Sequence, residues 1–259
     1  MKWLRNLAIW SLFAVFTAGF ATGAAAEPDA DTSGDDVVDH SSFGELLEEY
    51  VDDDGQIDYA RWHGSDEARQ ALSSYLDEVG STSARGESRD AVLAYLINAY
   101  NALVIDDVLD RWPVENVTEE EGFFDKKRHR VARGTMTLDE LDKEYIRERF
   151  GEPRINFVLV CAAKSCPPLR SEPLTADNLE KSLAEATRAY IPKVTEQVGE
   201  NRVRTSKLFE WYTEEFEEDA GSLATYLAHY VTDDELKKLL ESDDIDIVFD
   251  DYDWTINQS

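Results

Sequence analysis

The sequence predicts a helix-rich α+β domain with a small sheet that contains a buried core strand near residues 154–161. Three observations lead to this prediction. In residues 87–112, apolar side chains occupy most of the circumference of a helix, as they do in the central helix of a domain. The stretch "RINFVLVC" contains a run of apolar residues that is typical of a strand buried on both faces. Elsewhere, amphipathic segments alternate with short strand-like stretches, and the sequence contains no internal repeat.

The first 26 residues have the features of a secretory signal peptide. Lys2 and Arg5 precede an apolar run from Leu7 to Phe20, and three alanines at 24–26 provide small residues at a cleavage site. The apolar run is short for a helix that spans a bilayer. An uncleaved N-terminal anchor is the alternative that the sequence leaves open.

The remaining chain is expected to be exported and soluble. Residues 27–40 are acidic and short of large apolar side chains, so they are predicted to be a disordered leader. Residues 41–259 are predicted to form a single domain. No later segment reaches the roughly 18 uninterrupted apolar residues that a membrane span requires. We therefore expect a periplasmic or secreted protein that has no membrane contact after signal cleavage.

The chain is strongly acidic, with 55 Asp and Glu residues against 26 Lys and Arg residues and a formal net charge of −29. This charge disfavours binding to nucleic acid or to an anionic membrane, because both associate with proteins through Lys and Arg. The acidic residues are spread along the whole chain. That distribution favours a surface adapted to a saline medium, where ions screen self-repulsion, over a cationic partner or a calcium-rich surface.

The first predicted elements are a short helix, an acidic turn at Asp52–Gly55 and a strand-like stretch at 56–59. The turn lacks the spacing of a calcium-binding loop, because Tyr50 and Arg61 fall where carboxylates are required. A helix is then predicted at about 66–79, followed by the central helix.

A hairpin and a further helix are predicted before the core strand. We expect Gly134 and Thr135 at the turn of the hairpin. Thr137 and Glu140 have the spacing of a capping box, which predicts a helix from there to about Phe150. A Pro-Pro pair ends the core strand that follows, since proline lacks the N–H that a sheet requires.

The last third of the chain is predicted to alternate between helices and short strands. Thr175 opens an amphipathic helix, and Ser206 is placed to cap a later one. The predicted elements are a helix at 175–190, a strand at 201–205, helices at 207–216, 221–231 and 232–242, and a terminal strand at 245–257.

Two carboxamides, Asn98 and Asn101, share one face of the central helix because they are three residues apart. A buried carboxamide without hydrogen-bond partners costs about 1–3 kcal/mol, so both must be bonded or must face a wet pocket. Structural bonding to a neighbouring loop is the favoured account.

The chain contains two cysteines, Cys161 and Cys166. An even count in an oxidising compartment favours a disulfide between them. A loop this short would stabilise the fold by about 2 kcal/mol on the chain-entropy model. The spacing is not the C-x-x-C of a thioredoxin-like redox motif, and no His pair is placed to complete a zinc site, so we expect no metal and no cofactor.

A thiol nucleophile is the alternative use of Cys161 or Cys166. Lys164 between them could lower the pKa of a thiol, and a base would be required within hydrogen-bond reach. The candidate bases are His229 and His129, with Asn98 or Asn101 to orient the imidazole.

Several blocks of the sequence resemble, in order, a family known as domain of unknown function 547. The blocks are "YVDDDGQIDY", "AYLINAYNALVIDDVL", "PRINFVLVCAAKSCPPL", "KLFEWYTEEF" and "YDWTIN", and the similarity covers about Ser42 to Asn257. The resemblance implies one family-specific domain of an exported bacterial protein, without an assigned activity.

The pattern of this family falls on a defined set of residues in the chain. These residues are Asn98, Tyr100, Asn101, Cys161, Ser165, Cys166, Pro167, Pro168, Trp211 and Tyr212. The chain departs from the family at Lys143 and Asn156, where members often carry His. If the family uses an imidazole at either position, this chain lacks it.

The function expected from the sequence is that of a binding or accessory domain, with a disulfide-stapled turn beside a polar pocket. Its partner would be an unknown small molecule or a protein. A thiol-dependent hydrolase or acyltransferase is the alternative. The residues expected at the pocket are Asn98, Tyr100, Asn101, Asn156, Lys164, Ser165, Trp211 and Tyr212.

Overall fold

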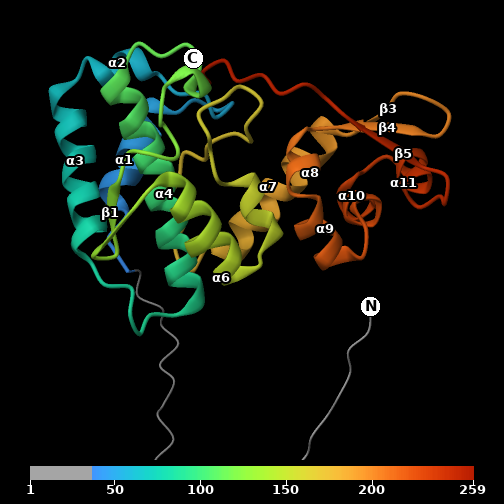
Figure 1. Cartoon of the computed structure of the whole chain (residues 1–259), viewed down its shortest axis with the longest axis horizontal. Helices are drawn as coiled ribbons and strands as arrows, with labels where there is room; N and C mark the ends of the chain where they lie inside the picture. Colours follow the sequence, from blue (N-terminus) through green and yellow to red (C-terminus); the bar gives the residue numbers. More distant parts are fainter. Residues whose placement is uncertain (1–36) are drawn as a thin grey trace, which may run out of the picture. The chain divides into compact units, whose positions relative to one another are not determined.

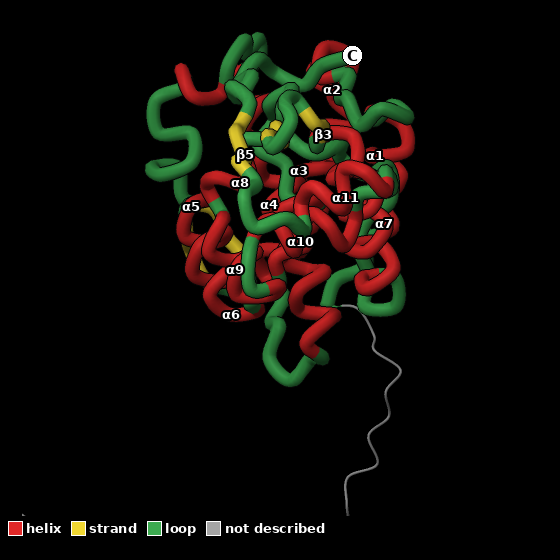
Figure 2. The backbone as a smooth tube through the Cα atoms, turned by 90° about the vertical axis from the view of Figure 1, so that its right-hand side faces the viewer, coloured by secondary structure: helices red, strands yellow, loops and turns green. Residues whose placement is uncertain are grey.

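The computed structural model describes residues 37–259, so the predicted signal peptide and most of the predicted leader lie outside the described residues. Figure 1 shows the order of the elements, and Figure 2 shows that helices dominate and strands are few. Within residues 37–259 the strands form one sheet of two and one sheet of three. The predicted helix-rich α+β class is therefore confirmed.

The domain begins before residue 41. Val38 and His40 belong to the predicted leader, yet both are buried, and His40 Nδ1 lies 2.8 Å from the hydroxyl of Tyr75. The prediction of disorder is therefore wrong for the last residues of the leader, because they pack against the first helices.

The first half of the domain is built around one central helix. Ser65 and Ser88 cap the N-termini of α3 and α4 through their hydroxyl groups. By length and composition α4 could cross a membrane, but 94% of its apolar window is buried inside the domain, as expected of a core helix. The helices are α1 (Ser41–Tyr50), α2 (Tyr59–His63), α3 (Asp66–Ser81) and α4 (Arg89–Arg111), followed by the short 3₁₀ helix η1 (Val117–Glu119).

The predicted hairpin is present as β1 (His129–Val131) and β2 (Gly134–Met136). Its turn lies at Ala132 and Arg133, with φ of 50° and 64°, and not at Gly134 and Thr135 as expected. Positive φ at both central residues gives a two-residue turn whose twist matches the twist of the strands. The expectation that glycine would occupy the turn was therefore wrong by two positions.

The helix after the hairpin contains a π-helical segment. Thr137 and Glu140 form the predicted capping box, and Gly151 ends the helix in a left-handed conformation. The three consecutive parts are α5 (Leu138–Glu140), the π-helical segment η2 (Leu141–Arg147) and α6 (Glu148–Phe150).

The predicted core strand is not a strand. Residues Pro153–Phe157 form a 3₁₀ helix, η3, and residues 158–161 run on without a strand partner. The burial was predicted correctly, since Val158 and Val160 are both buried. The predicted pairing with another strand was wrong. The carboxamide of Asn101 instead accepts from Val160 N at 2.9 Å and donates to Val158 O at 2.8 Å. One side chain thus satisfies the backbone groups that a neighbouring strand would otherwise bond.

The second half of the domain places short helices beside the three-stranded sheet. The helix predicted from Thr175 starts four residues later, because Thr175 and Asn178 bond to each other in a turn. β4 pairs antiparallel with β3 and parallel with β5. The elements are α7 (Leu179–Val194), β3 (Glu196–Gln197), β4 (Arg202–Thr205), α8 (Leu208–Trp211), α9 (Thr213–Ala220), α10 (Leu223–Tyr230), α11 (Asp234–Leu240) and β5 (Asp246–Phe249).

The segment after β5 returns to the first half of the domain, where Figure 1 shows it in red ending near α2. Its backbone bonds to the loop of the cysteines, with Lys164 N to Thr255 O at 2.8 Å and Ser165 N to Asp253 O at 3.2 Å. Farther on, Ile57 N donates to Asn257 O at 3.0 Å. These bonds hold the aromatic residues of the last segment beside the cysteines.

Candidate functional site

A pocket of about 250 Å³ lies where the cysteine loop, the π-helical segment and the last segment of the chain meet. Five of its lining residues are Trp or Tyr, and two are charged. The lining residues are Tyr100, Asp142, Arg147, Asn156, Leu159, Cys161, Cys166, Pro167, Leu208, Trp211, Tyr212, Tyr252 and Trp254. A concave, mainly apolar surface with a few convergent polar groups is typical of a binding site for a small molecule.

The π-helical segment brings the two charged groups of the pocket together. Asp142 and Arg147 are five residues apart, and in an α-helix that spacing would point them about 140° apart. In η2 the backbone bonds connect residues five apart, so both side chains leave the same side. Arg147 Nε donates to Asp142 Oδ1 at 2.8 Å as a result. Segments of π-helix are rare and occur often at functional sites.

The guanidinium of Arg147 also joins η2 to the second half of the domain. Its Nη1 donates to Asn156 Oδ1 at 2.9 Å and to both carboxylate oxygens of Glu215 in α9, at 2.9 and 3.0 Å. Its Cζ lies over the ring of Tyr212, 3.7 Å from the ring centroid. Because the side chain of Arg147 is only 12% exposed, these contacts fix its position in the wall of the pocket.

Burial shapes the electrostatics of the pocket. It raises the pKa of Asp142, and the positive charge of Arg147 opposes that increase. Burial also raises the pKa of Tyr100 well above its ordinary value, with the nearby Asp142 adding to the effect. The hydroxyl of Tyr100 is therefore a neutral donor and acceptor at physiological pH.

Three aromatic rings form one wall of the pocket. The centroid of Tyr252 lies 4.7 Å from those of Trp211 and Trp254, and the two tryptophans are stacked at 5.7 Å. Trp211 is 45% exposed, an unusual degree of exposure for so large an apolar side chain. The rings therefore present aromatic surface to solvent at the pocket.

Cys161 and Cys166 are joined by a disulfide, with their Cα atoms 6.3 Å apart. The disulfide that the sequence favoured is thus present in the structure. The hydroxyl of Tyr252 lies 3.2 Å from each sulfur, so the disulfide contacts the aromatic wall directly. Both cysteines line the pocket.

Residues 84–191 match the family model described as "Protein of unknown function, DUF547". The match supports the resemblance that the sequence blocks indicated, over that part of the chain. Comparison of the chain with curated proteins and with solved structures found no match.

The pocket combines residues from inside and outside the DUF547 segment. That segment supplies Tyr100, Asp142, Arg147, Asn156 and the two cysteines. The aromatic wall comes from later residues, and the bonds between the last segment and the cysteine loop bring them together.

Half of the residues expected at the pocket line it. Tyr100, Asn156, Trp211 and Tyr212 do so. Asn156 donates to Pro153 O at 3.0 Å and to Glu215 Oε2 at 2.8 Å. Its role in this chain is therefore to hold the polar network of Arg147 in place.

The other expected pocket residues lie elsewhere. Lys164 and Ser165 line a neighbouring pocket of about 530 Å³ that shares Cys166 and Tyr252 with the first. Asn98 is buried and bonds to the backbone of Leu174 in both directions, at 2.7 and 3.0 Å. Asn98 and Asn101 thus bond to the backbone, the account that the sequence favoured; both line a separate cavity of about 10 Å³, and neither lines the pocket of the cysteines.

The candidate bases of a thiol enzyme do not line the pocket of the cysteines. His129 is buried in β1, where its Nε2 lies 3.2 Å from Asp107 Oδ2. His229 is exposed on α10. Among the described residues that line this pocket there is no histidine. The structure therefore does not bring together the cysteine, histidine and asparagine residues that the alternative requires. Lys143 is exposed and pairs with Asp139 at 2.7 Å.

Sequence reasoning missed Asp142, Arg147, Glu215, Tyr252 and Trp254. The block "YDWTIN" contains the two aromatic residues and was a usable signal, since it belongs to the family resemblance. Asp142 and Arg147 gave no signal, because residues five positions apart do not lie on the same face of an ordinary α-helix.

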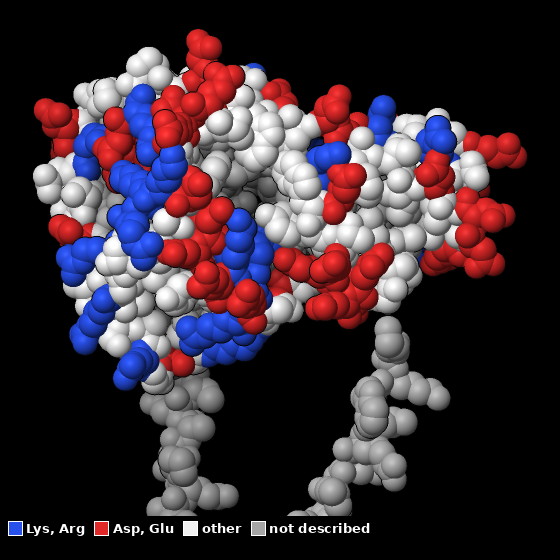
Figure 3. Space-filling model, in the orientation of Figure 1, with Lys and Arg blue, Asp and Glu red and all other residues white. Residues whose placement is uncertain are grey.

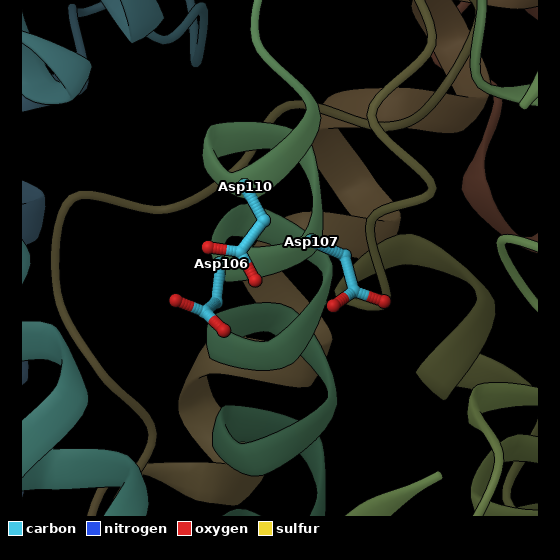
Figure 4. Close-up of side chains that lie close together, drawn as sticks. All are labelled: Asp106, Asp107 and Asp110. Atoms are coloured by element: carbon cyan, nitrogen blue, oxygen red, sulfur yellow. The ribbon is translucent and has the colours of Figure 1, made fainter. Parts of the chain in front are cut away.

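A second group of charged residues lies on α4, outside the pocket. Figure 4 shows that Asp106 and Asp110 lie side by side, whereas Asp107 leaves the helix on another side. Lys127 bonds to both Asp107 and Asp110, and Arg69 bonds to Asp110 at 2.7 Å. Because basic side chains already pair with Asp107 and Asp110, we assign these two carboxylates to the stability of the fold.

Proposed function

We propose that the protein is an exported binding domain whose aromatic pocket holds a small polar molecule. The observation that carries this proposal is the pair Asp142–Arg147, which a π-helical segment places in a pocket walled by aromatic rings. A buried ion pair adds little net stability, because the desolvation of both charges offsets their attraction. Its presence in a concave surface is therefore better explained by recognition of a ligand.

The proposed export rests on the N-terminal sequence and fits the chemistry of the cysteines. Lys2 and Arg5 with the following apolar run have the features of a signal peptide. A disulfide persists in a periplasmic or extracellular medium and is rare in the cytosol. The acidic composition favours a protein that stays soluble in a saline medium.

A binding role is favoured over a thiol-dependent enzyme because each cysteine sulfur is bonded to the other. We expect the purified protein to gain no mass from iodoacetamide under native conditions without reductant. After denaturation and reduction it should gain two carbamidomethyl groups, as measured by intact-mass spectrometry. Rapid alkylation of one cysteine in the native, untreated protein would favour the thiol enzyme.

The binding function itself can be tested by thermal unfolding in the presence of a varied library of small polar molecules. We expect at least one chemical class to raise the melting temperature of the wild-type protein by several degrees, because a ligand that binds the folded state stabilises it. The same compounds should have little effect on Trp211→Ala, which removes an exposed ring from the pocket.

A matched control for this test is Val198→Ala. Val198 is 41% exposed, similar to Trp211, and does not line the pocket. This variant should respond to ligands as the wild type does. A library without any stabilising compound, or compounds that stabilise Trp211→Ala equally well, would contradict a binding role for this pocket.

A further inference from the structure

We propose that the ligand of this pocket is a neutral polyhydroxylated molecule, that is, a carbohydrate. The inference rests on the proposed function, since it names the chemical class that the same pocket would bind. Three features of the pocket lead to it: the balance of its charges, the polar atoms left without partners, and the exposed aromatic wall.

The charges of the pocket disfavour a charged ligand. A cation would have to compete with the fixed guanidinium of Arg147 for the carboxylate of Asp142, to which that guanidinium is already bonded. An anion would meet the carboxylate of Asp142 in the pocket, and the charge of Arg147 is already compensated by its bonds to Asp142 and Glu215. The anion would also approach a chain with a formal charge of −29. A neutral ligand avoids both costs.

Four polar groups of the pocket are available to a ligand. Within residues 37–259, no hydrogen-bond partner is found for the hydroxyls of Tyr100 and Tyr212, for Asp142 Oδ2 or for Arg147 Nη2. Arg147 offers donors, Asp142 offers an acceptor, and each tyrosine hydroxyl offers both. A ligand with several hydroxyl groups matches this set, because each hydroxyl also donates and accepts.

An apolar ligand fits the same groups poorly. It would cover Asp142 and Arg147 and leave their remaining hydrogen-bonding atoms without water and without a partner. Each such group, when buried without a partner, weakens binding by roughly tenfold or more. The polar atoms of the pocket therefore select against a purely apolar molecule.

The aromatic wall supplies the other half of the recognition. One face of a sugar ring is lined by C–H groups, which pack against an aromatic face and bury apolar surface. Trp211, Tyr252 and Trp254 form such a surface beside the four polar groups. In the orientation of Figure 3, charged side chains are dense over α9 and over the outer part of the first half, and uncharged surface lies between them.

The test is isothermal titration of the purified protein with three sets of probes. The neutral set contains D-glucose, D-galactose, D-mannose, N-acetyl-D-glucosamine, maltose and cellobiose. The cationic set contains tetramethylammonium and choline, and the anionic set contains acetate and succinate. Tryptophan fluorescence is recorded in parallel, because Trp211 and Trp254 report directly on contact with the aromatic wall.

Two pairs of variants locate the binding. Trp211→Ala should weaken binding of the preferred sugar at least tenfold, while Trp211→Tyr, which keeps a ring in place, should retain most of the affinity. Tyr100→Phe removes one hydroxyl from the pocket and should weaken binding about fivefold. Its control, Tyr145→Phe, removes a hydroxyl from a ring outside the pocket that is 43% exposed, and should leave the affinity unchanged.

The outcomes separate this inference from the proposed function. Binding of at least one neutral sugar that is lost in Trp211→Ala supports both. Binding of a cation or an anion, sensitive to Trp211→Ala, without binding of any sugar overturns the carbohydrate assignment and leaves the binding function in place. Sugar binding that Trp211→Ala and Tyr100→Phe do not weaken also overturns the assignment. Failure of all three probe sets and of the wider library overturns both proposals.

Discussion

Replacing Asn101 with leucine is expected to lower the free energy of unfolding by about 2–5 kcal/mol, since it leaves two buried backbone groups without partners. The carboxamide of Asn101 bonds to both Val158 O and Val160 N, and all three residues are buried. Leucine has a similar volume, so the change opens little space for a water molecule to take over these bonds. Chemical denaturation followed by circular dichroism measures the effect.

The matched control is Asn178→Leu. Asn178 also bridges backbone groups, accepting from Thr175 N at 2.8 Å and donating to Pro173 O at 3.1 Å, but it is only half-buried. Water can satisfy these groups after the substitution, so we expect a loss of about 1 kcal/mol or less. If the two variants lose equal amounts of unfolding free energy, the bonds of Asn101 to Val158 and Val160 are not what stabilises this segment.

The substitution at Asn101 also bears on the pocket. Residues 158–161 lead directly into the cysteine loop, and Leu159 and Cys161 line the pocket. If Asn101→Leu remains folded at low temperature, its ligand affinity should fall even though Asn101 lies outside the pocket. Asn101 is therefore a positioning residue, which acts on the pocket by holding residues 158–161 in place.

The helices and the fold class could be predicted because they leave periodic signals over many residues. The apolar pattern of α4 and the capping box at Thr137 and Glu140 are local, and the structure contains both. The core segment was predicted to be buried for the same reason. The prediction that this segment is a strand was wrong. An apolar run indicates that a segment is buried, but it does not indicate which groups bond to the backbone of that segment.

The pocket could be predicted only in part, because most of it depends on contacts between distant residues. The disulfide and four lining residues came from the cysteine count and from the family resemblance. The Asp142–Arg147 pair depends on a change of helical period that no local pattern marks. The contribution of Tyr252 and Trp254 depends on backbone bonds between residues about 90 positions apart, such as Lys164 N to Thr255 O. Contacts between residues so far apart in the sequence leave no local pattern from which they could be predicted.

A second large loss of stability is expected when Asp107, whose side chain is 0% exposed, is replaced. It bonds to Lys127, and its Oδ2 lies 3.2 Å from His129 Nε2 and 3.7 Å from Arg111 Nη1. Asp107→Asn keeps the shape of the side chain but removes the charge that these groups face. Removing one member of a buried ion pair costs about 3–5 kcal/mol, and the partial exposure of Lys127, with its second bond to Asp110, reduces this to about 2–3 kcal/mol.

The substitution Asp106→Asn, at the neighbouring position, serves as the control. It should raise the free energy of unfolding at pH 7, whereas Asp107→Asn should lower it. Burial raises the pKa of Asp106 to about 6, and repulsion from Asp110 contributes to the increase. A carboxyl whose pKa is higher in the folded state stabilises the fold below its unfolded pKa of about 4, and this contribution is lost as the pH rises to about 6. Asp106→Asn should therefore stabilise the protein at pH 7, by an amount of the order of 2 kcal/mol, and this gain should vanish at about pH 4.

Comparing the two variants by denaturation at pH 4 and pH 7 separates two roles on one helix. If Asp107 anchors the basic side chains, Asp107→Asn destabilises at pH 7 and Asp106→Asn does not. If the three carboxylates instead shared a bound cation, both variants would destabilise, and a chelator would lower the stability of the wild type. Because Lys127 already bridges Asp107 and Asp110, we expect the chelator to have no effect.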